Sequence, residues 1–398
     1  MIKHSVIFLF LLLLCFSCSD RQKDNRYVYV DFSQCLSNER PMKLSEIADT
    51  VEYLELKTPG DLIITRISEV IPIEDCWLVR SREGVVLFTG QGEFIRQIGR
   101  RGQGPGEYLQ LRGLDYDPVR QEILIVDSQQ ILFYDLEGNY KRNIKIREDY
   151  FYNIARADTV LWTTGLGIHL EKHECYAFNQ NGDTLATFPN PYYGIQVKNT
   201  DGVYFSHSRL DKEFYRFGEE LYLKNRPSYD TVFHLYGTQR IPHIIFEMGK
   251  YKLPVEYETW YCNADYERYA SDYWGVSSVA EDERFLFLLS KRRYSTQPDS
   301  YDYIPEDWRY IVFDKETGQG FSVKDGKQQW ITDDMLGGPS FWPRIVTDQY
   351  YIQTIEWYEI LQDVKAGVYS LAPALQKQFD SFTPGTNELL VLCRRKNR

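Results

Sequence analysis

Residues 77–98 read WLVRSREGVVLFTGQGEFIRQI, and residues 123–144 read ILIVDSQQILFYDLEGNYKRNI. The second stretch begins 46 residues after the first, and both place apolar residues and a turn glycine at equivalent positions. A self-similarity of about 40–50 residues, built from short alternating strands, is typical of a β-propeller blade. The repeat therefore predicts an architecture, but not a chemistry. The identical pairs are Leu78 and Leu124, Gly92 and Gly138, Arg96 and Arg142, and Ile98 and Ile144.

Further strand-and-turn units follow outward from this repeat. A third is expected within residues 160–188, a fourth within 202–248, a fifth within 284–324 and a sixth within 344–394. The strand Val51–Leu56 precedes the first unit, and we expect it to complete the last blade, which hides the open edges of the ring. The sequence thus predicts an all-β fold, a six-bladed β-propeller of four-stranded antiparallel blades closed by an N-terminal strand.

The first residues are typical of a targeting segment. Val6 to Phe16 is an apolar run of 11 residues, shorter than the about 20 needed to cross a bilayer but suited to a signal peptide. Ser17-Cys18 then fits cleavage before a cysteine that becomes lipidated, and an ordinary secretory signal cut near Ser17 is the alternative. We predict a lipoprotein signal peptide at 1–17, a tether and N-terminal segment at 18–40, and one propeller domain at 41–398.

Composition narrows the function classes. The net charge is −11, which argues against nucleic-acid binding. Five cysteines remain beyond Cys18, scattered and without CxxC spacing, so neither a disulfide framework nor a cysteine-based zinc site is expected. A chain of this length is normal for one propeller, in which each blade packs only on its neighbours, and we expect a monomer.

A glycine-rich loop carries a family resemblance. The run Gly99-Arg-Arg-Gly-Gln-Gly-Pro-Gly-Glu-Tyr108 resembles the inter-blade loop of NHL-like propellers. Together with the signal at Cys18, the chain resembles the six-bladed β-propeller lipoproteins of Bacteroidales-type bacteria. The resemblance covers the mature chain. It implies the fold and a location at the outer membrane, on either its periplasmic or its surface face. It implies no mechanism.

Two interpretations of this loop remain open. Its glycines let the backbone pass close to a ligand, and arginine forks suit carboxylate or phosphate groups. The alternative is a tight crossover between blades in which the glutamate pairs with an arginine. As candidate ligand-binding residues, the loop offers Arg100, Arg101, Gln103, Glu107 and Tyr108.

The segment Tyr251–Trp274 offers a second candidate site. It combines six tyrosines and two tryptophans with several carboxylates, which suits stacking on sugars or contact with a protein. The alternative is a cap that packs its rings on the propeller. The candidate binding residues here are Tyr257, Trp260, Tyr261, Tyr266 and Trp274.

Acidic and histidine clusters are weaker signals. His169 and His173 lack the HExxH order of a zincin, and the sequence favours a solvated hairpin. Glu281-Asp282-Glu283 and Asp333-Asp334 are expected to be charged turns. We predict no catalytic residues, no cofactor and no metal ligands. The predicted function is a lipid-anchored binding or scaffolding module for a glycan, a peptide or an envelope protein. The alternative is a propeller hydrolase, lyase or lactonase with a cation such as Ca²⁺ in its channel.

Overall fold

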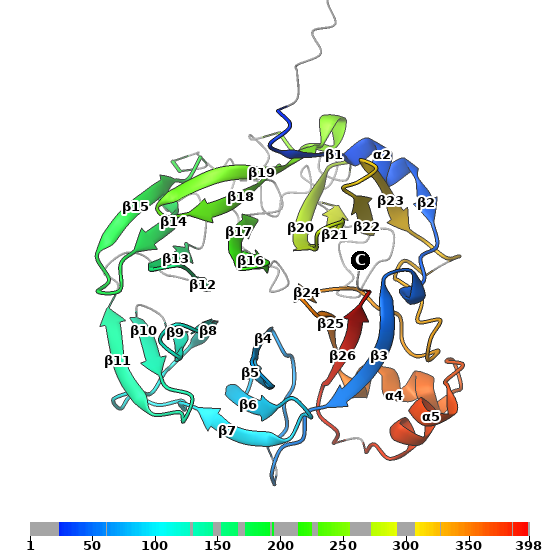
Figure 1. Ribbon diagram of the computed structural model, residues 1–398, viewed down its shortest axis with the longest axis horizontal. Coiled ribbons are helices and arrows are strands. Elements are labelled where there is room, and N and C mark those ends of the chain that lie inside the picture. Colours follow the sequence, from blue (N-terminus) through cyan, green and yellow to red (C-terminus); the bar gives the residue numbers. More distant parts are fainter. Residues whose placement is uncertain are drawn as a thin grey trace, which may run out of the picture.

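The computed structural model describes residues 24–396 except for 61, 128–129, 146–152, 166–171, 192, 195–213, 225–229, 255–271, 293–306, 327 and 384. The described strands form six blades around a central channel (Figure 1). The predicted fold class is confirmed. In every blade one strand faces the channel, and the following strands lie progressively further out.

Blades 1 to 3 are four-stranded antiparallel sheets in simple chain order. Their strands are β4 (Glu69–Ile73), β5 (Cys76–Arg80), β6 (Val85–Thr89) and β7 (Phe94–Ile98) in blade 1; β8 (Leu111–Asp117), β9 (Glu122–Asp127), β10 (Gln130–Tyr134) and β11 (Tyr140–Lys145) in blade 2; and β12 (Asn153–Ala157), β13 (Val160–Thr164), β14 (His173–Phe178) and β15 (Thr184–Pro189) in blade 3.

Blades 4 to 6 follow the same plan, with strands contributed from the N-terminal region. Their strands in chain order outward from the channel are β16 (Phe214–Phe217), β17 (Glu220–Lys224), β18 (Thr231–Tyr236) and β19 (Gln239–Glu247) in blade 4; β20 (Trp274–Glu281), β21 (Phe285–Arg292), β22 (Trp308–Asp314) and β23 (Gln319–Val323) in blade 5; and β24 (Ile345–Val346), β25 (Tyr350–Ile355), β26 (Leu389–Arg395) and β3 (Ala48–Glu55) in blade 6.

The 46-residue repeat corresponds to the three outer strands of blades 1 and 2. Gly92 and Gly138 occupy the turns β6–β7 and β10–β11 with φ of 79° and 80°, a left-handed backbone that favours glycine. A Cβ on Gly92 would also lie 2.1 Å from the carbonyl oxygen of Glu55 in blade 6. The repeated glycine therefore serves both the hairpin and, in blade 1, the contact with the last blade.

An N-terminal strand closes the ring, as predicted. Strand β3 pairs antiparallel with β26, with Tyr53 opposite Val391. A strand from near the N-terminus and the last described strand thus share blade 6, and the outer edge of β26 is covered. Closure by hydrogen bonds between distant parts of the chain removes the edges that an open array would expose.

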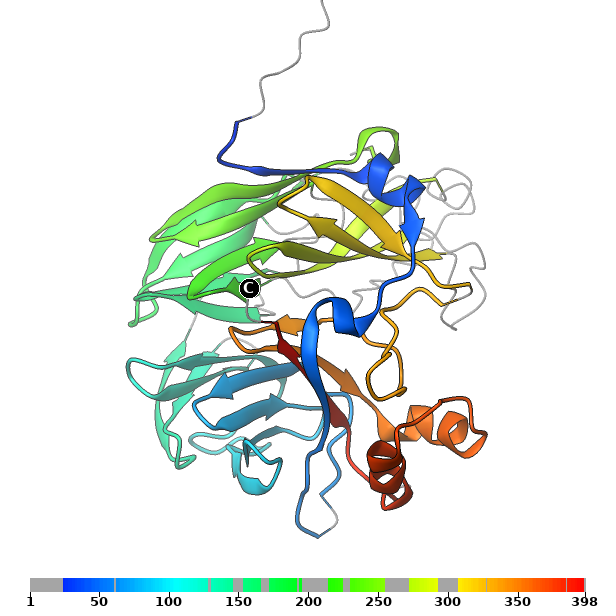
Figure 2. The ribbon, with the colours of Figure 1, turned by 45° about the vertical axis from the view of Figure 1, so that its right-hand side comes forward.

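Residues ahead of β3 add two further strands that the sequence did not predict. Strand β1 (Val28–Asp31) pairs in parallel with β19, and β2 (Glu39–Arg40) pairs in parallel with β23, so blades 4 and 5 have five strands. Helix α2 (Phe32–Ser37) connects them across the outside of the ring (Figure 2). Its Phe32 and Cys35 are fully buried. The packed part of the chain therefore begins well before residue 41.

The core consists of apolar clusters between neighbouring blades. Between blades 1 and 2, for example, Leu78 and Leu87 pack against Ile123 and Leu132. The largest cluster lies between blades 5 and 6, where two helices extend the core. These are α4 (Trp357–Lys365) and α5 (Pro373–Asp380). They bury Trp357 and Phe379 against each other, with ring centroids 5.1 Å apart.

Short 3₁₀ turns complete the described elements: η1 (Leu44–Glu46), at the position where the sequence predicted a single helical turn, and η2 (Gly249–Tyr251). The four cysteines Cys35, Cys76, Cys175 and Cys393 are free thiols in the described part of the chain, and all but Cys76 are buried. No helix among the described residues is both long and apolar enough to cross a membrane.

Candidate functional site

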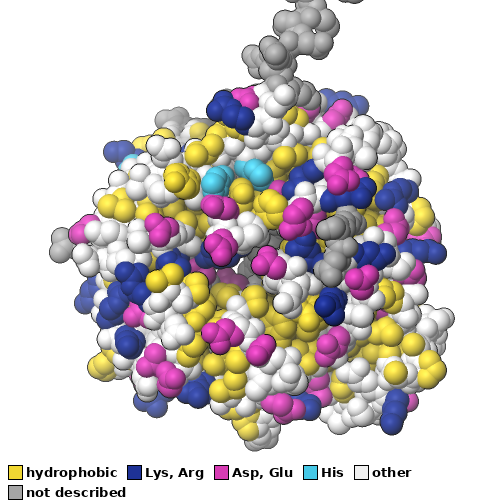
Figure 3. Space-filling model, viewed as in Figure 1, with side chains coloured by type: hydrophobic (Ala, Val, Ile, Leu, Met, Phe, Trp, Pro, Cys, Tyr) yellow, Lys and Arg dark blue, Asp and Glu magenta, His cyan; other side chains and the backbone are white. Residues whose placement is uncertain are grey.

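The central channel contains a cavity of about 320 Å³. All six innermost strands contribute to its wall, namely β4, β8, β12, β16, β20 and β24. The volume lies at the lower end of the about 300–1,000 Å³ typical of small-molecule sites. Figure 3 shows the hollow at the centre of one face, with acidic side chains around it. The channel is thus the place where residues from every blade converge.

Most of the channel wall is apolar. Aliphatic side chains from opposite sides of the ring face the cavity, including Ile71 of blade 1, Ile154 of blade 3 and Val346 of blade 6. Such a wall favours ligands that leave water with apolar surface. The remaining aliphatic or proline wall residues are Val70, Pro72, Leu114, Ala155, Leu221, Val279, Ala280 and Ile345.

One polar group in the wall links three blades. Asp115 of β8 accepts a hydrogen bond from the backbone N–H of Arg156 at 2.6 Å. Its carboxylate also pairs with Nη2 of Arg216, from β16, at 3.1 Å. The same Nη2 donates to the carbonyl oxygen of Arg156 at 2.8 Å. Asp115 therefore fastens blades 2, 3 and 4 together, and its charge is neutralised by Arg216.

A second polar group joins blades 4 and 5. The carboxylate of Glu281, at the end of β20, is fully buried and lies 3.0 Å from Nε2 of His243 and 2.9 Å from Nζ of Lys315. The hydroxyl of Tyr215 donates to it at 2.8 Å. Burial raises the pKa of Glu281, but His243 and Lys315 outweigh burial, so its pKa lies below the ordinary value. Burial and the charge of Glu281 raise the pKa of Tyr215 far above its ordinary value.

This network has a chemical consequence. Glu281 is ionised and its two oxygens are already occupied by three donors, while Tyr215 stays protonated as one of those donors. A general base needs a free oxygen within hydrogen-bond reach of a substrate. The arrangement is therefore suited to holding two blades together rather than to moving a proton.

The acidic run Glu281-Asp282-Glu283 differs from the expected charged turn. Asp282 does lie in the turn between β20 and β21, but both it and Glu281 are buried, and Glu283 alone is exposed. Asp282 accepts hydrogen bonds from the backbone N–H groups of Arg284 and Phe285 and from the hydroxyl of Tyr351. Asp333 is likewise buried. The local turn contacts fit the prediction, but the burial of these residues comes from partners far along the chain, such as Tyr351 for Asp282 and Tyr53 for Asp333.

The glycine-rich loop Gly99–Tyr108 connects blades 1 and 2, and its residues follow the structural interpretation. Arg100 Nε donates to Glu107 at 2.6 Å, and Glu107 also accepts from the backbone N–H of Gly104 at 2.8 Å. That N–H and Arg100 lower the pKa of Glu107. Arg101 donates to the carbonyl oxygen of Arg82. Tyr108 is fully buried in the core, and Gln103 is exposed.

The aromatic candidates lie largely outside the described residues. Tyr257, Trp260, Tyr261 and Tyr266 belong to that part, and so does His169. Trp274 is the first residue of β20 and is 4% exposed, with the guanidinium carbons of Arg292 and Arg309 lying 4.9 and 5.3 Å from its ring centroid. The ring is therefore occupied by protein contacts.

The channel also bears on the alternative of a bound cation. Across the ranges that the structure describes, no group of three or more His, Cys, Asp or Glu side chains is arranged to hold a metal ion. Three of the four wall carboxylates are paired with cations instead: Glu69 with Arg80 at 2.6 Å, besides the two pairs above. The fourth, Asp348, is exposed. The wall therefore combines carboxylates, as an enzyme site would, with an apolar surface, as a binding site would.

Sequence reasoning missed the channel because it missed most innermost strands. Strands β4, β8, β12, β16 and β20 were not expected. Strand β4 contains Pro72 and β8 reads LRGLDYD, and proline or isolated charges weaken a strand pattern. The one available signal was the number of strands: each of the first five expected units had three strands, one fewer than a four-stranded blade needs.

Comparisons with known proteins agree with this architecture. A family model described as "Domain of unknown function (DUF4934)" matches residues 28–394. The crystal structure of a "Putative exported protein" from Bacteroides fragilis has a TM-score of 0.68 at 16% identity, covering 93% of this chain and 100% of that one. At this identity the likeness shows the fold alone. No curated protein matches the chain in sequence.

Two further solved structures are more distant. The WD40 domain of Neurospora crassa Pan2 has a TM-score of 0.37 at 9% identity, covering 72% of this chain and 73% of that one. The extracellular domain of a "putative one component system" from B. thetaiotaomicron also has a TM-score of 0.37, at 11% identity, covering 69% of this chain and 29% of that one.

Proposed function

The chain belongs to the DUF4934 family, described as a domain of unknown function, and from this premise we propose that it is a ligand-binding module of the bacterial cell envelope. Its ligand occupies the central channel. The observation that carries the proposal is a cavity of about 320 Å³ whose wall is largely apolar and whose inward carboxylates Glu69, Asp115 and Glu281 are paired with cations.

The paired carboxylates favour binding over catalysis. A hydrolase or lyase of this shape would need free carboxylates to hold a cation or to transfer a proton. In the described wall, Asp115 and Glu281 instead spend their hydrogen bonds on neighbouring blades. A rigid, preformed cavity binds with little ordering cost, which suits a module that captures a ligand without changing it.

The envelope location rests on the N-terminal sequence. Val6–Phe16 and Ser17-Cys18 support export and lipidation at Cys18. The lipid chains then hold the propeller at the outer membrane as a monomer. We keep a glycan, a peptide or an envelope protein as the proposed class of partner, and propose that the bound part of it enters the channel.

An uncharged apolar fluorophore tests whether the channel binds ligands. We expect N-phenyl-1-naphthylamine to brighten on binding the mature protein. Val346→Trp should reduce that affinity at least about tenfold, because the indole fills part of the cavity, and a tenfold loss corresponds to about 1.4 kcal/mol. Val119→Trp is the matched control, since Val119 is 83% exposed in a turn outside the wall.

Thermal unfolding of both variants shows whether the ring stays folded. Equal binding by Val346→Trp and the unmodified protein, with both folded, would mean that the channel is not the binding site. Loss of binding in Val119→Trp would point to the outer surface instead.

A further inference from the structure

The two ends of the channel carry opposite free charges. Six charged side chains line the cavity. Four of them belong to ion pairs already described, namely Glu69, Asp115, Arg216 and Glu281. The two that remain are Arg344 and Asp348. Neither side chain has an ion-pair partner within 4 Å among the described residues, although Glu359 and Glu388 lie within electrostatic range of Arg344.

Arg344 and Asp348 flank the same innermost strand. Arg344 precedes β24, and Asp348 follows it in the turn to β25. Four residues of fully extended chain would span roughly 13 Å, and the turn that contains Asp348, closed by the N–H of Thr347 on the carbonyl oxygen of Tyr350, makes the backbone separation shorter than that. Arg344 and Asp348 still lie at opposite ends of the two-residue strand β24. The wall between them is apolar.

The end that contains Asp348 is negative over a wider area. The turns that follow the innermost strands of blades 1, 3 and 4 expose Glu74, Asp75, Asp158 and Glu219. Figure 3 shows acidic side chains around the opening on this face. Like charges around a cleft focus the potential there and attract a cationic group.

The innermost strands also offer backbone groups. Each of β4, β8, β12, β16, β20 and β24 is the last strand of its sheet on the channel side. The edge of a sheet presents N–H and C=O groups that an added extended chain can pair with. A peptide can use such groups along its whole length, whereas an acyl chain cannot.

We propose that the channel binds a short apolar peptide with free termini, its α-carboxylate at Arg344 and its α-amino group at Asp348. The assignment rests on the proposed function, because it requires the channel to be the binding site. Three extended residues span about 10 Å, which is within the roughly 13 Å that is the upper limit on the separation of the Arg344 and Asp348 backbones. Apolar side chains then contact the aliphatic wall, and the guanidinium can take the carboxylate with two hydrogen bonds.

The tripeptide Ala-Leu-Ala and its capped forms test the assignment by calorimetry with the mature protein. We expect the free peptide to bind, and the N-acetylated form and the C-amide each to bind about tenfold more weakly, because each capped end loses a charge-assisted hydrogen bond. Arg344→Gln should remove the preference for the free carboxylate, and Asp348→Asn the preference for the free amine.

Matched controls keep these comparisons specific. Arg82→Gln and Asp325→Asn remove exposed charges that lie outside the cavity wall, and both should retain the preference for free termini. Decanoate, an apolar anion without an amine, is the competing ligand.

Four outcomes decide the matter. The peptide assignment is supported if Arg344→Gln loses only the preference for the free carboxylate and Asp348→Asn loses only the preference for the free amine. Equal affinity for free and capped peptides, or tighter binding of decanoate, overturns the peptide while channel binding stands. If the fluorophore binds but no peptide does, the peptide assignment is likewise overturned and channel binding stands. Failure of both fluorophore and peptide to bind overturns the proposed function as well.

Discussion

Among single side chains, Glu388 is a deeply buried carboxyl group, and in water such a group would be ionised at neutral pH. It is 5% exposed, just before β26, and its Oε2 accepts from the backbone N–H of Ile67 at 2.6 Å. Burial raises its pKa to about 7, and the N–H of Ile67 only partly opposes this effect. The group therefore prefers to be protonated in the folded chain.

The pH dependence of stability follows from that pKa. Because the pKa in the folded state lies above the unfolded value, the contribution of Glu388 is present below about pH 4.5 and is lost as pH rises through 7. Glu388→Gln, which cannot ionise, should therefore be more stable than the unmodified chain at pH 8, by on the order of 2–3 kcal/mol, with little difference at pH 4.5. Urea unfolding at several pH values measures this. A constant difference across the range would contradict it.

Among strands and helices, the structure adds most to the sequence prediction at the N-terminal elements β1, α2 and β2. Residues 18–40 were expected to form a tether and an N-terminal segment, and within that stretch β1 and β2 pair with the outer strands of blades 4 and 5. Two- and four-residue strands separated by a one-and-a-half-turn helix have no clear periodicity. They become stable because α2 buries its apolar side against the propeller.

The contribution of helix α2 can be tested through Phe32, which is fully buried among apolar side chains. We expect Phe32→Ala to lower the free energy of unfolding by about 3–5 kcal/mol, through lost burial and the cavity left behind. Tyr358→Ala removes an aromatic side chain that is 75% exposed on α4, and as a control it should change the free energy by about 0.5 kcal/mol or less. Chemical denaturation compares the two. Equal small losses would mean that α2 is not part of the cooperative unit.

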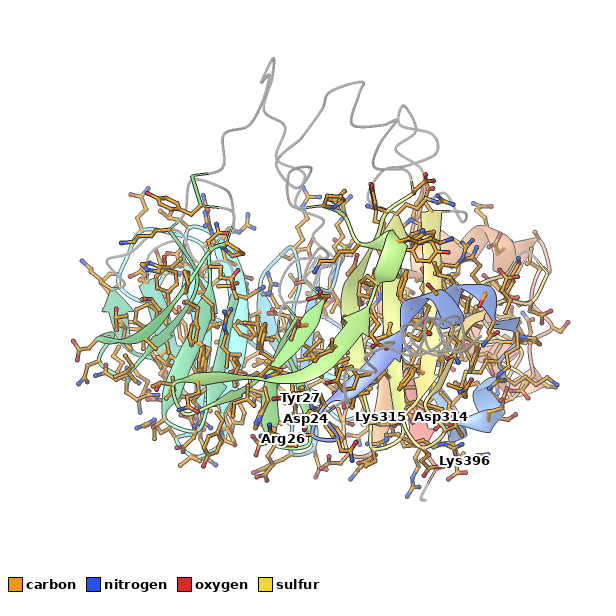
Figure 4. All side chains as sticks on the ribbon, turned by 90° about the horizontal axis from the view of Figure 1, so that it is seen from above. Asp24, Arg26, Tyr27, Asp314, Lys315 and Lys396 are labelled. Atoms are coloured by element: carbon orange, nitrogen blue, oxygen red, sulfur yellow. The ribbon has the colours of Figure 1, made fainter. Side chains whose placement is uncertain are left out.

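For the propeller as one unit, we expect the place where the chain enters to set its orientation on a membrane if Cys18 is lipidated as proposed. Asp24, Arg26 and Tyr27 lie toward the same face as Lys315 and Lys396 (Figure 4). Six residues separate Asp24 from the proposed lipid site Cys18, and extended chain of that length reaches about 21 Å. We therefore expect this face to lie toward the membrane.

Fluorescence quenching on vesicles measures the orientation. A fluorophore at Lys396→Cys, in a Cys76→Ser background, should be quenched more strongly by headgroup-labelled lipid than one at Arg82→Cys, which lies in the β5–β6 turn. The Cys18→Ala variant should stay in the aqueous phase and show no quenching. Equal quenching at both positions would contradict the orientation, and vesicle binding by Cys18→Ala would contradict the lipid anchor.

Local sequence patterns were enough to predict the outer strands, the hairpins and the closure of the ring. Alternating apolar residues and turn glycines such as Gly92 and Gly138 act over a few residues, so they can be recognised without knowing what packs against them. The strand completing blade 6 was predicted by the same means, since one unpaired strand was left over.

The channel could not be found this way, because its residues acquire their roles from partners far along the chain. Asp115 meets Arg216, and Glu281 meets Tyr215 and His243, only after separate blades close around the axis. Nothing within a few residues of Asp115 or Glu281 distinguishes a buried, paired carboxylate from a solvated turn. The blades were thus encoded by short-range periodicity, whereas the cavity and its charges were decided by the closure of the ring, which brings together groups that no local pattern relates.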